Sequence, residues 1–464
     1  MNHSPRPAPL APKAPMLGLP LLAEIRRDPL AAATRLQQEC GDVAELRILF
    51  RRILYFYTPE AAREILVEHP DDFLREARLL RIFESFQGRN VLTTEGADWE
   101  RQRRLLTPAF SSRRMAGYMG LMRAAIDDSI RDELPAGSGQ SASVDVDALT
   151  TRITMDVILR TLFSHAATRE EIRSASVAIR GLTRQSMREV YWALIPPDWL
   201  PYPGRSEKRA QIRTLRQLMA RHIDTRQPRA EGDPRDADVL DMLLAACDDT
   251  PGSGAATLST PEVYDNCLLL FAAGFDTASS ALTWWIGLMA THPQMAAQVR
   301  EEVELAQAAG ADLAGIARLP LLNATIKEAM RLYPPSTALF TRVAQRDHTI
   351  AGIKIARGDL IAVPIWSLHR DPRSFPDPEA FRPERFLPGA PAIPRGAYMP
   401  FGAGPHFCLG QHFASVEMAL VAAELICHYD LSLDAGVQLP EPCVDLALKP
   451  KTPMRVRFTP ARPR

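Results

Sequence analysis

Hydrophobic residues recur with the spacing of α-helices along most of this chain. Apolar positions three and four residues apart predict amphipathic helices, and they do so over 98–132, 145–190, 205–226 and 236–248. Residues 43–57 are rich in branched and aromatic side chains and predict strands, and residues 349–365 alternate like a small hairpin or sheet. Proline and glycine are dense from 371 to 407, which predicts irregular loop. The pattern therefore predicts a mainly α protein with a minor sheet toward each end of the chain.

Capping residues mark where several of these helices begin and end. Thr58 followed by Pro59 predicts a helix with threonine as its N-cap, because proline fits the first helical turn. Thr260 and Pro261 predict the start of a long central helix in the same way. The sequence Thr291-His292-Pro293 predicts the end of that helix and the start of the next.

The central helix contains the longest apolar run of the chain, residues 268–290, which is long enough to cross a bilayer. Asp276 and Thr277 lie at its centre, and a bilayer core penalises an unpaired charge. We therefore expect this helix to run buried through a large folded core. Residues 1–20 hold six prolines and no continuous apolar stretch, so they predict a proline-rich arm, not a signal peptide or a membrane anchor.

Composition is that of an ordinary globular protein, with 46% hydrophobic and 24% charged residues. Basic and acidic residues balance at 55 each, so net charge does not indicate a nucleic-acid partner. The six cysteines lack paired spacing, which favours a reducing compartment and, with no anchor, a cytoplasmic protein. Proline- and glycine-rich residues at 227–236 and 249–256 predict loops within one domain, so we expect residues 21–464 to form a single domain.

Cys408 lies in the run FGAGPHFCLG, from Phe401 to Gly410, directly ahead of a long apolar-faced helix. The positive end of the helix dipole and its unpaired N–H groups favour thiolate over thiol, and thiolate is the form that binds metal. Gly402 and Gly404 flank a turn that would let the backbone come close to a flat cofactor. This arrangement predicts an axial cysteine ligand to heme iron.

Cys408 also fits two roles that do not involve heme. Buried free cysteines beside a helix start are common, because cysteine behaves as a small hydrophobic residue. A zinc site could instead use His406, Cys408 and His412, although the chain offers no CxxC pair and no nearby fourth ligand.

The central helix carries a second chemical motif, Ala273-Gly274-Phe275-Asp276-Thr277. Gly274 has no side chain, so a flat ligand or dioxygen could approach the backbone there. Thr277 could bond a carbonyl one turn back, or release it and open a local bulge for ligand and water. Asp276 could then feed protons in. A simple helix kink, with Asp276 facing solvent, accounts for the same residues equally well.

Two further motifs place strong hydrogen-bonding groups on helix faces. Glu328 and Arg331 are three residues apart, and their apolar flanks predict a buried, multiply bonded pair with Arg382 and Arg385 of FRPERF as partners for Glu328. The exposed ion pair that this spacing usually indicates is the alternative.

Trp99 and Arg103 lie four residues apart on one predicted helix. Indole N–H and guanidinium groups are strong donors for carboxylates, such as the two propionates of heme. Arg342 and His406 are further candidate donors. Taken one by one, packing or a solvated surface is the more usual role for each of these residues, and only their joint occurrence favours propionate binding.

Together and in this order, the W-x-x-x-R helix, AGFDT, E-x-x-R with FRPERF, and the cysteine loop resemble the cytochrome P450 superfamily of heme-thiolate monooxygenases. The similarity covers nearly all of the chain beyond the proline-rich arm. It implies the cytochrome P450 fold, a mainly α, triangular single-domain prism with small β-sheets. It also implies heme b (iron protoporphyrin IX), buried between the central helix and the cysteine-loop helix.

The resemblance implies a role for each matching residue. Cys408 looks like the axial ligand of heme iron, and Thr277 with Asp276 looks like the oxygen-activating catalytic pair. The residues that match the structural network are Glu328, Arg331 and Arg385. The residues implied in cofactor binding are Trp99, Arg103, Ala273, Gly274, Arg342, Phe401, Gly402, His406, Cys408 and Gly410. The residues implied to line the substrate pocket are Val91, Leu92, Ala272, Phe275, Thr337, Ala338, Leu339 and Leu446.

The implied activity is insertion of one oxygen atom of O2 into a C–H or C=C bond of a hydrophobic small molecule, such as a terpenoid or a fatty acid. His406 stands where many members have arginine, a substitution also seen among soluble bacterial members, so the resemblance is to the bacterial type. The segment 196–205, PPDWLPYPGR, is expected to cap the entrance between two mobile helices.

Electrons are expected to come from a separate ferredoxin and ferredoxin reductase, or from a flavoprotein reductase, because the chain ends soon after the heme loop. A basic cluster would suit an acidic redox partner, although an ordinary solvated helix face accounts for it equally well. The members of this cluster are Arg101, Arg104, Arg113 and Arg114.

The resemblance leaves two alternatives to a monooxygenase. The first is a peroxide-using or isomerising heme-thiolate enzyme; such members tend to lose the acid–alcohol pair, which this chain keeps at Asp276 and Thr277. The second is a non-catalytic heme sensor, which normally needs an output module, and none is visible in the sequence.

Overall fold

The computed structural model describes residues 18–48, 51–135, 140–192, 200–226, 238–247 and 257–461. Several expectations lie wholly or partly outside these residues: the proline-rich arm up to residue 17, the loops at 227–236 and 249–256, and residues 196–199 of the entrance segment. Helix α1 (Leu19–Arg27) begins at Leu19, after Gly18 with a φ of 81°, and the boundary of the arm at residue 20 stays a prediction.

The chain forms two compact units, each assembled from stretches that are distant in the sequence. The first unit comprises Met1–Arg81, Lys327–Cys408 and Pro442–Lys449. The second unit comprises Ile82–Ile326, Leu409–Glu441 and Pro450–Arg464. The boundary falls inside two helices, α4 (Ala77–Gln87) and α14 (Pro320–Leu332). The single domain expected for residues 21–464 stays a prediction.

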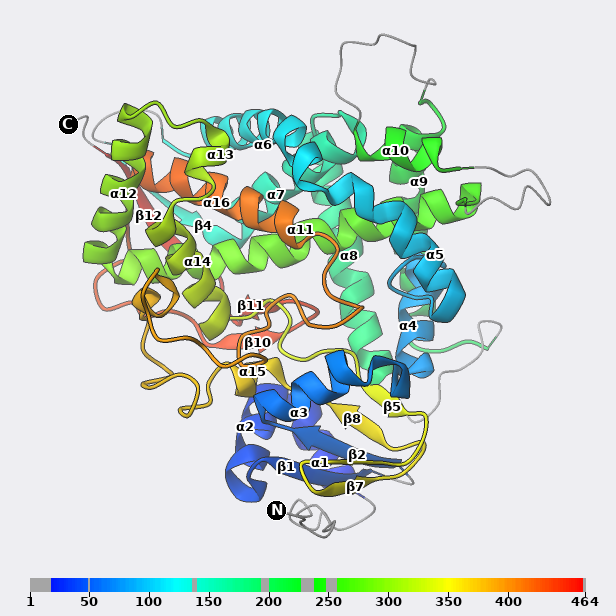
Figure 1. Ribbon diagram of the computed structural model, residues 1–464. Helices are drawn as coiled ribbons and strands as arrows, with labels where there is room; N and C mark the ends of the chain where they lie inside the picture. Colours follow the sequence, from blue (N-terminus) through cyan, green and yellow to red (C-terminus); the bar gives the residue numbers. More distant parts are fainter. Residues whose placement is uncertain are drawn as a thin grey trace. The chain divides into compact units, whose positions relative to one another are not determined.

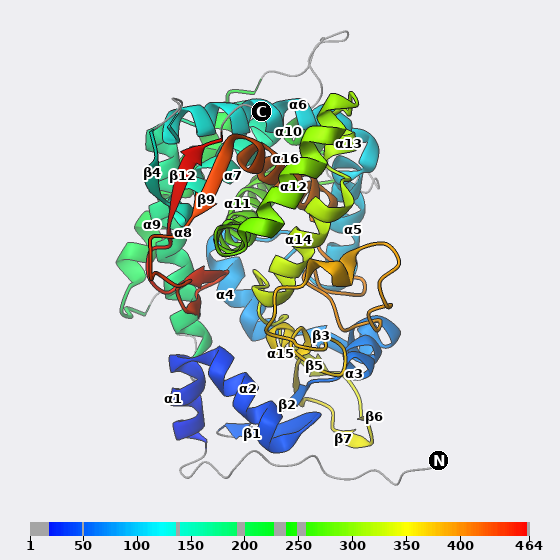
Figure 2. The same cartoon turned by 90° about the vertical axis from the view of Figure 1, so that its left-hand side faces the viewer.

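The first unit is built on a five-stranded sheet in the order β1-β2-β8-β5-β3 (Figures 1 and 2). Strands β2 and β8 are parallel, and the other neighbours are antiparallel. Leu54, Phe56 and Ile361 are fully buried within it, which explains why these strands are apolar and branched. The strands are β1 Val43–Ile48, β2 Arg51–Phe56, β3 Phe73–Arg75, β5 Arg342–Ala344 and β8 Leu360–Ala362. The strands predicted over 43–57 are therefore confirmed.

The remaining elements of the first unit are short. A separate hairpin, β6 (His348–Ile350) with β7 (Ile353–Ile355), confirms the hairpin predicted within 349–365. The Thr58 side chain accepts a hydrogen bond from the N–H of Ala61 at 3.3 Å, which confirms its capping role. The helices and minor strands are α2 Pro29–Cys40, α3 Pro59–Arg63, a π-helical turn Glu64–Glu68, 3₁₀ turns Pro70–Asp72 and Pro383–Phe386, α15 Ile365–Leu368, β10 Pro442–Val444 and β11 Leu448–Pro450.

The second unit is a helical assembly around the long helix α11 (Thr260–Thr291), which packs along α7 and also contacts α16 and α12 (Figure 1). Its helices are α5 Gly96–Leu106, a 3₁₀ turn Thr107–Phe110, α6 Ser112–Glu133, α7 Val146–Phe163, α8 Arg169–Val190, α9 Arg205–Ile223, α10 Val239–Ala245, α12 Pro293–Ala308, α13 Leu313–Ile316 and α16 Gln411–His428. Figure 2 shows a small antiparallel sheet with β12 (Arg455–Pro460) between β4 (Ala142–Asp145) and β9 (Tyr429–Ser432).

Helix α11 is the only described helix that is long and apolar enough, by length and composition, to cross a membrane. Of its most apolar stretch, 72% is buried inside the protein. Trp284, Trp285 and Phe271 are among the largest fully buried side chains. The expectation of a core helix is therefore confirmed.

The predicted helices 98–132 and 145–190 are each two helices in the structure. The first is broken by the 3₁₀ turn Thr107–Phe110, because Pro108 has no N–H to donate within a continuing helix. The second is broken at Ser164, which ends α7 in the left-handed region with a φ of 53°. Thr168 then starts α8 through a capping box.

The predicted start of α11 is wrong by one residue. Ser259, not Thr260, is the N-cap, and the Glu262 carboxylate accepts a hydrogen bond from the Ser259 N–H at 2.9 Å. Pro261 therefore lies at the second helical position. The predicted end is confirmed, because α11 ends at Thr291 and α12 begins at Pro293.

Candidate functional site

Cys408 closes a tight loop that leads into α16. Its N–H donates to the Phe401 carbonyl at 3.0 Å, and the Phe407 N–H donates to the Gly404 carbonyl at 3.0 Å. Cys408 is exposed, and Gly410 is the N-cap of α16. The structure therefore confirms the predicted helix start just beyond the thiol, where the helix dipole favours thiolate.

The two glycines of this loop, Gly402 and Gly404, have different surroundings. Both have positive φ, 76° at Gly402 and 73° at Gly404. A Cβ on Gly404 would lie 1.8 Å from the Leu66 carbonyl oxygen, so Gly404 is required for packing inside the first unit. A Cβ on Gly402 would meet only a Leu339 methyl group, at 3.5 Å. Apart from this methyl group, the space in the side-chain direction of Gly402 is open.

Glu328 and Arg331 form the buried pair that the sequence predicts. Both side chains are 0% exposed, and two hydrogen bonds of 2.8 Å join guanidinium and carboxylate. The remaining N–H groups of Arg331 donate to the carbonyls of His369, Pro378 and Ala380. Because every face of the pair is hydrogen bonded, its burial is tolerated.

The two arginines of FRPERF reach Glu328 in different ways. Arg385 donates from Nε to Oε1 at 3.3 Å, as expected. Arg382 reaches the same oxygen through its backbone N–H at 2.9 Å, and its side chain pairs with exposed Asp377 at 3.0 Å. Both arginines are therefore partners of Glu328, as predicted, Arg385 through its side chain and Arg382 through its backbone.

His369 is a member of this network that the sequence prediction missed. It is fully buried, its Nε2 accepts from the Met399 N–H at 3.0 Å, and its ring stacks on Tyr398. Burial, together with the charges of Arg370 and Arg331, lowers the pKa of His369 to about 3, so the ring stays neutral. A histidine inside the apolar run IWSLH was the available signal.

On α11 the acid–alcohol motif lies within an unbroken α-helix. The Thr277 hydroxyl donates to the Ala273 carbonyl at 2.8 Å, which is the first of the two arrangements expected for it. Thr277 and Ala273 are exposed, although Phe275 and most of their neighbours on α11 are buried. This one-turn stretch is therefore an accessible strip on a core helix.

Gly274 faces a side chain of the neighbouring helix α7, whereas open space for a ligand was expected there. A Cβ at this position would lie 2.9 Å from a methyl group of Ile158 on α7. The missing side chain therefore lets α7 and α11 pack closely. A contact between Gly274 and a cofactor stays a prediction.

The predicted propionate donors are divided between the two units. Trp99 and Arg103 lie one turn apart on α5, and both are partly buried. Arg342 is buried at the start of β5, and His406 is partly buried in the cysteine loop.

The basic cluster expected for a redox partner has fewer available charges than its four arginines suggest. Arg101 donates to the Glu262 carboxylate at 2.5 Å and 3.1 Å and to the Thr257 carbonyl at 2.6 Å, so its charge is neutralised within the protein. Arg104 and Arg113 are exposed, and Arg114 is partly exposed.

The expected substrate-pocket residues differ in exposure. Ala338 and Leu446 of the first unit are exposed, and Thr337 and Leu339 are partly buried. In the second unit, Leu92 is partly buried. The buried residues there are Val91, Ala272 and Phe275. Their pocket role stays a prediction.

Among the described residues, one group of three has metal-ligand spacing, and it comprises His165, Glu171 and His222. The zinc alternative for Cys408 therefore gains no support.

Known proteins resemble this chain over most of its length. A sequence profile described as Cytochrome P450 matches residues 7–458. Cyclooctatin synthase of Streptomyces melanosporofaciens is 30% identical, over 93% of this chain and 93% of the relative. Cyclooctat-9-en-7-ol 5-monooxygenase of the same organism is 31% identical over 86% of this chain and 84% of the relative. Cytokinin hydroxylase of Arabidopsis thaliana is 28% identical over 86% of this chain and 78% of the relative.

These similarities, with the mainly helical fold and the cysteine loop ahead of α16, define a heme-dependent monooxygenase. The chain belongs to the cytochrome P450 family. It is a cytochrome P450 monooxygenase with heme b as its cofactor, and enzymes of this family use redox partners and bind hydrophobic substrates.

The cysteine loop fits this cofactor. Cys408 offers an exposed thiol, the ligand type that the family uses for iron. A Cβ on Gly410 would meet nothing within 4 Å, so together with Gly402 the backbone around the thiol is open.

Proposed function

We propose that this enzyme hydroxylates or epoxidises a hydrophobic cyclic terpenoid, with electrons from a separate ferredoxin. The observation that carries the proposal is the similarity to two enzymes of one organism, over more than four fifths of each chain. The name of one of them, cyclooctat-9-en-7-ol 5-monooxygenase, denotes a cyclic unsaturated alcohol as its substrate. The mainly apolar residues expected to line the pocket agree with a substrate of this kind.

Cys408 holds the iron in this proposal, and Trp99, Arg103, Arg342 and His406 bind the propionates. Heme bound in this way supplies the activation of dioxygen and the oxidation of the C–H bond. The assignment is supported by the exposed thiol of Cys408 and by the open space beside Gly402 and Gly410. The cationic or N–H donor groups of the four propionate residues support it as well. The protein contributes orientation, a dry pocket and protons.

Thr277 and Asp276 deliver those protons in our proposal. The Thr277 hydroxyl is held by the Ala273 carbonyl at 2.8 Å, and a rotation about χ1 frees it to donate toward a ligand. Asp276 is partly exposed one residue earlier, so it can exchange protons with solvent. The accessible strip on α11 supports this role.

The redox partner binds, in this proposal, to the basic surface of Arg104, Arg113 and Arg114. Their exposure and like charge suit an acidic ferredoxin.

Incubation of the heme-loaded enzyme with cyclic terpenoid hydrocarbons or alcohols is expected to shift the heme from low to high spin. Turnover with a bacterial ferredoxin, its reductase and NADPH is expected to add one oxygen atom to the product, measured by mass spectrometry with ¹⁸O2. Fatty acids of matched size serve as the control. A spin shift and product with fatty acids alone would contradict the terpenoid assignment, and turnover with peroxide alone would favour the peroxygenase alternative. Absence of any product with a competent ferredoxin would favour the heme sensor.

Thr277→Ala is expected to uncouple electron use from product formation by roughly tenfold or more, because a positioned proton donor contributes about 10²–10⁴-fold to a rate. NADPH consumption, peroxide release and product are measured together. Thr291→Ala is the matched control, because its hydroxyl donates to the Gly287 carbonyl of the same helix at 3.2 Å, away from the motif. Unchanged coupling in Thr277→Ala would remove the proposed role.

A further inference from the structure

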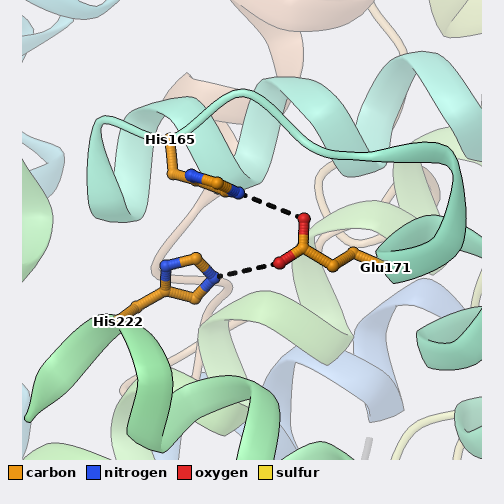
Figure 3. Close-up of side chains that lie close together, drawn as sticks. All are labelled: His165, Glu171 and His222. Atoms are coloured by element: carbon orange, nitrogen blue, oxygen red, sulfur yellow. Dashed lines mark hydrogen bonds and ion pairs between the residues drawn. The ribbon is translucent and has the colours of Figure 1, made fainter.

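Three side chains that are distant in the sequence converge in the second unit. His165 follows the end of α7, Glu171 lies in the first turn of α8, and His222 lies in the last turn of α9. One ligand atom from each lies within 4.8 Å of the others. Figure 3 shows both imidazole rings pointing toward the carboxylate, one toward each of its oxygens.

His222 is the residue that points to a binding site. Its side chain is 10% exposed, and its Nε2 is buried without a hydrogen-bond partner. This nitrogen faces Oε1 of Glu171 at 4.0 Å, which is too long for a hydrogen bond. An unpaired buried nitrogen is unfavourable unless another group binds it.

Glu171 is already held in the orientation that a ligand needs. Its Oε2 accepts from the Thr168 N–H at 3.0 Å and from the Thr168 hydroxyl at 2.8 Å. His165 lies 3.1 Å from the same oxygen through Nε2. Oε1 is left to face His222. The two hydrogen bonds from Thr168 are the usual kind of support for a carboxylate at a metal site.

The positions of the two histidines are fixed by packing and by an ionic network. His222 stacks on Phe163 with ring centroids 4.9 Å apart. Next to His165, the Ser164 hydroxyl donates to Asp238 at 2.8 Å. Arg226 pairs with Asp238 at 2.5 Å and with Asp241 at 3.3 Å, so its charge is balanced within the network, whereas Arg221 is a second positive charge near the His222 ring.

We propose that His165, Glu171 and His222 bind one zinc ion, which ties together the end of α7, the start of α8 and the end of α9. Two imidazoles and one carboxylate are a ligand set that zinc uses, whereas calcium and magnesium prefer oxygen ligands alone. Ligand atoms around tetrahedral zinc lie about 3.3–3.4 Å apart for bonds of about 2.0–2.1 Å. His165 Nε2 lies 3.1 Å from Oε2 of Glu171, His222 Nε2 lies 4.0 Å from Oε1, and one ligand atom of each residue lies within 4.8 Å of the others, so side-chain rotations of about 1 Å bring them to this range. His165 is 37% exposed, which leaves a path for the ion and a place for water as the fourth ligand.

The test measures zinc binding by the full-length, heme-loaded enzyme without an affinity tag, after treatment with a chelator. Equilibrium dialysis with metal analysis is expected to give one tightly bound zinc per chain, and the midpoint of thermal unfolding is expected to rise by a few degrees. Hydrogen exchange is expected to slow at residues 164–172 and 216–226 when zinc is added.

The variants test whether zinc binds at this site or at other histidines of the protein. Glu171→Gln keeps the capping box of α8, because glutamine also caps, and is expected to weaken zinc binding at least tenfold, as is His165→Ala. His428→Ala is the matched control, because His428 pairs with Glu424 at 2.9 Å without a second histidine. Absence of saturable zinc binding in the unmodified enzyme, or equal binding in Glu171→Gln and His165→Ala, would overturn the proposal.

Discussion

Replacing Cys408 by serine is expected to abolish the thiolate-type spectrum of the reduced, CO-bound enzyme and to reduce turnover to background. A hydroxyl is a much poorer ligand for heme iron than a thiolate, and the thiolate is what promotes cleavage of the O–O bond in this family. The loop itself should persist, because its closing bonds use the backbone of Cys408 and Phe401, not the sulfur. Absorption spectra and product formation measure the effect.

Cys443→Ser is the matched control for this substitution. Cys443 is a partly buried thiol of β10, in the same unit. Its replacement is expected to leave both spectrum and turnover intact. A Cys408→Ser enzyme with an unaltered spectrum would disprove the assignment of the iron ligand.

Replacing Arg331 by alanine is expected to destabilise the enzyme by about 3–5 kcal/mol, because it leaves the Glu328 carboxylate buried without its main partner. Arg331 also donates to three backbone carbonyls and lies over the Phe375 ring, so those contacts are lost as well. Since folded domains are stable by only about 5–15 kcal/mol, we expect little correctly folded protein. Heme content and the midpoint of urea unfolding measure the effect.

Arg382→Ala is the matched control for Arg331→Ala. Its guanidinium pairs with Asp377 at 3.0 Å, and both side chains are at least half exposed. An exposed pair contributes only about 0–1 kcal/mol, and the backbone N–H of residue 382 still donates to Glu328. Equal destabilisation by both substitutions would show that the buried pair contributes no more to stability than the exposed pair. Arg331→Lys should fall between them, because lysine cannot reproduce the planar set of donors.

Local sequence patterns predicted the elements well where the cause is itself local. The caps at Thr58 and Gly410 were predictable, because capping depends on residues within one turn. The break inside 98–132 was predictable in principle from Pro108, but the apolar periodicity on both sides concealed it. The start of α11 was misplaced because Ser259 and Thr260 are both good caps, and Glu262 decided between them.

The candidate site was predictable only in part. The buried Glu328–Arg331 pair was predictable from its spacing and apolar flanks. The roles of Cys408 and Thr277 are implied by the family resemblance of their short motifs and stay predictions. His369 was missed, because its role depends on burial beside residues that are distant in the chain. Arg101 was assigned to an outer surface, because the sequence does not show that Glu262 lies opposite.

The amino-acid sequence by itself determined the family, the iron-ligand candidate and the order of the main helices, because these depend on residue types and short spacings. Only the tertiary structure decided which side chains meet. Ile158 fills the space beside Gly274, the backbone of Arg382 reaches Glu328, and His165, Glu171 and His222 converge. The physical reason is that packing and buried hydrogen bonds join residues far apart in the chain, and no local pattern encodes their partners.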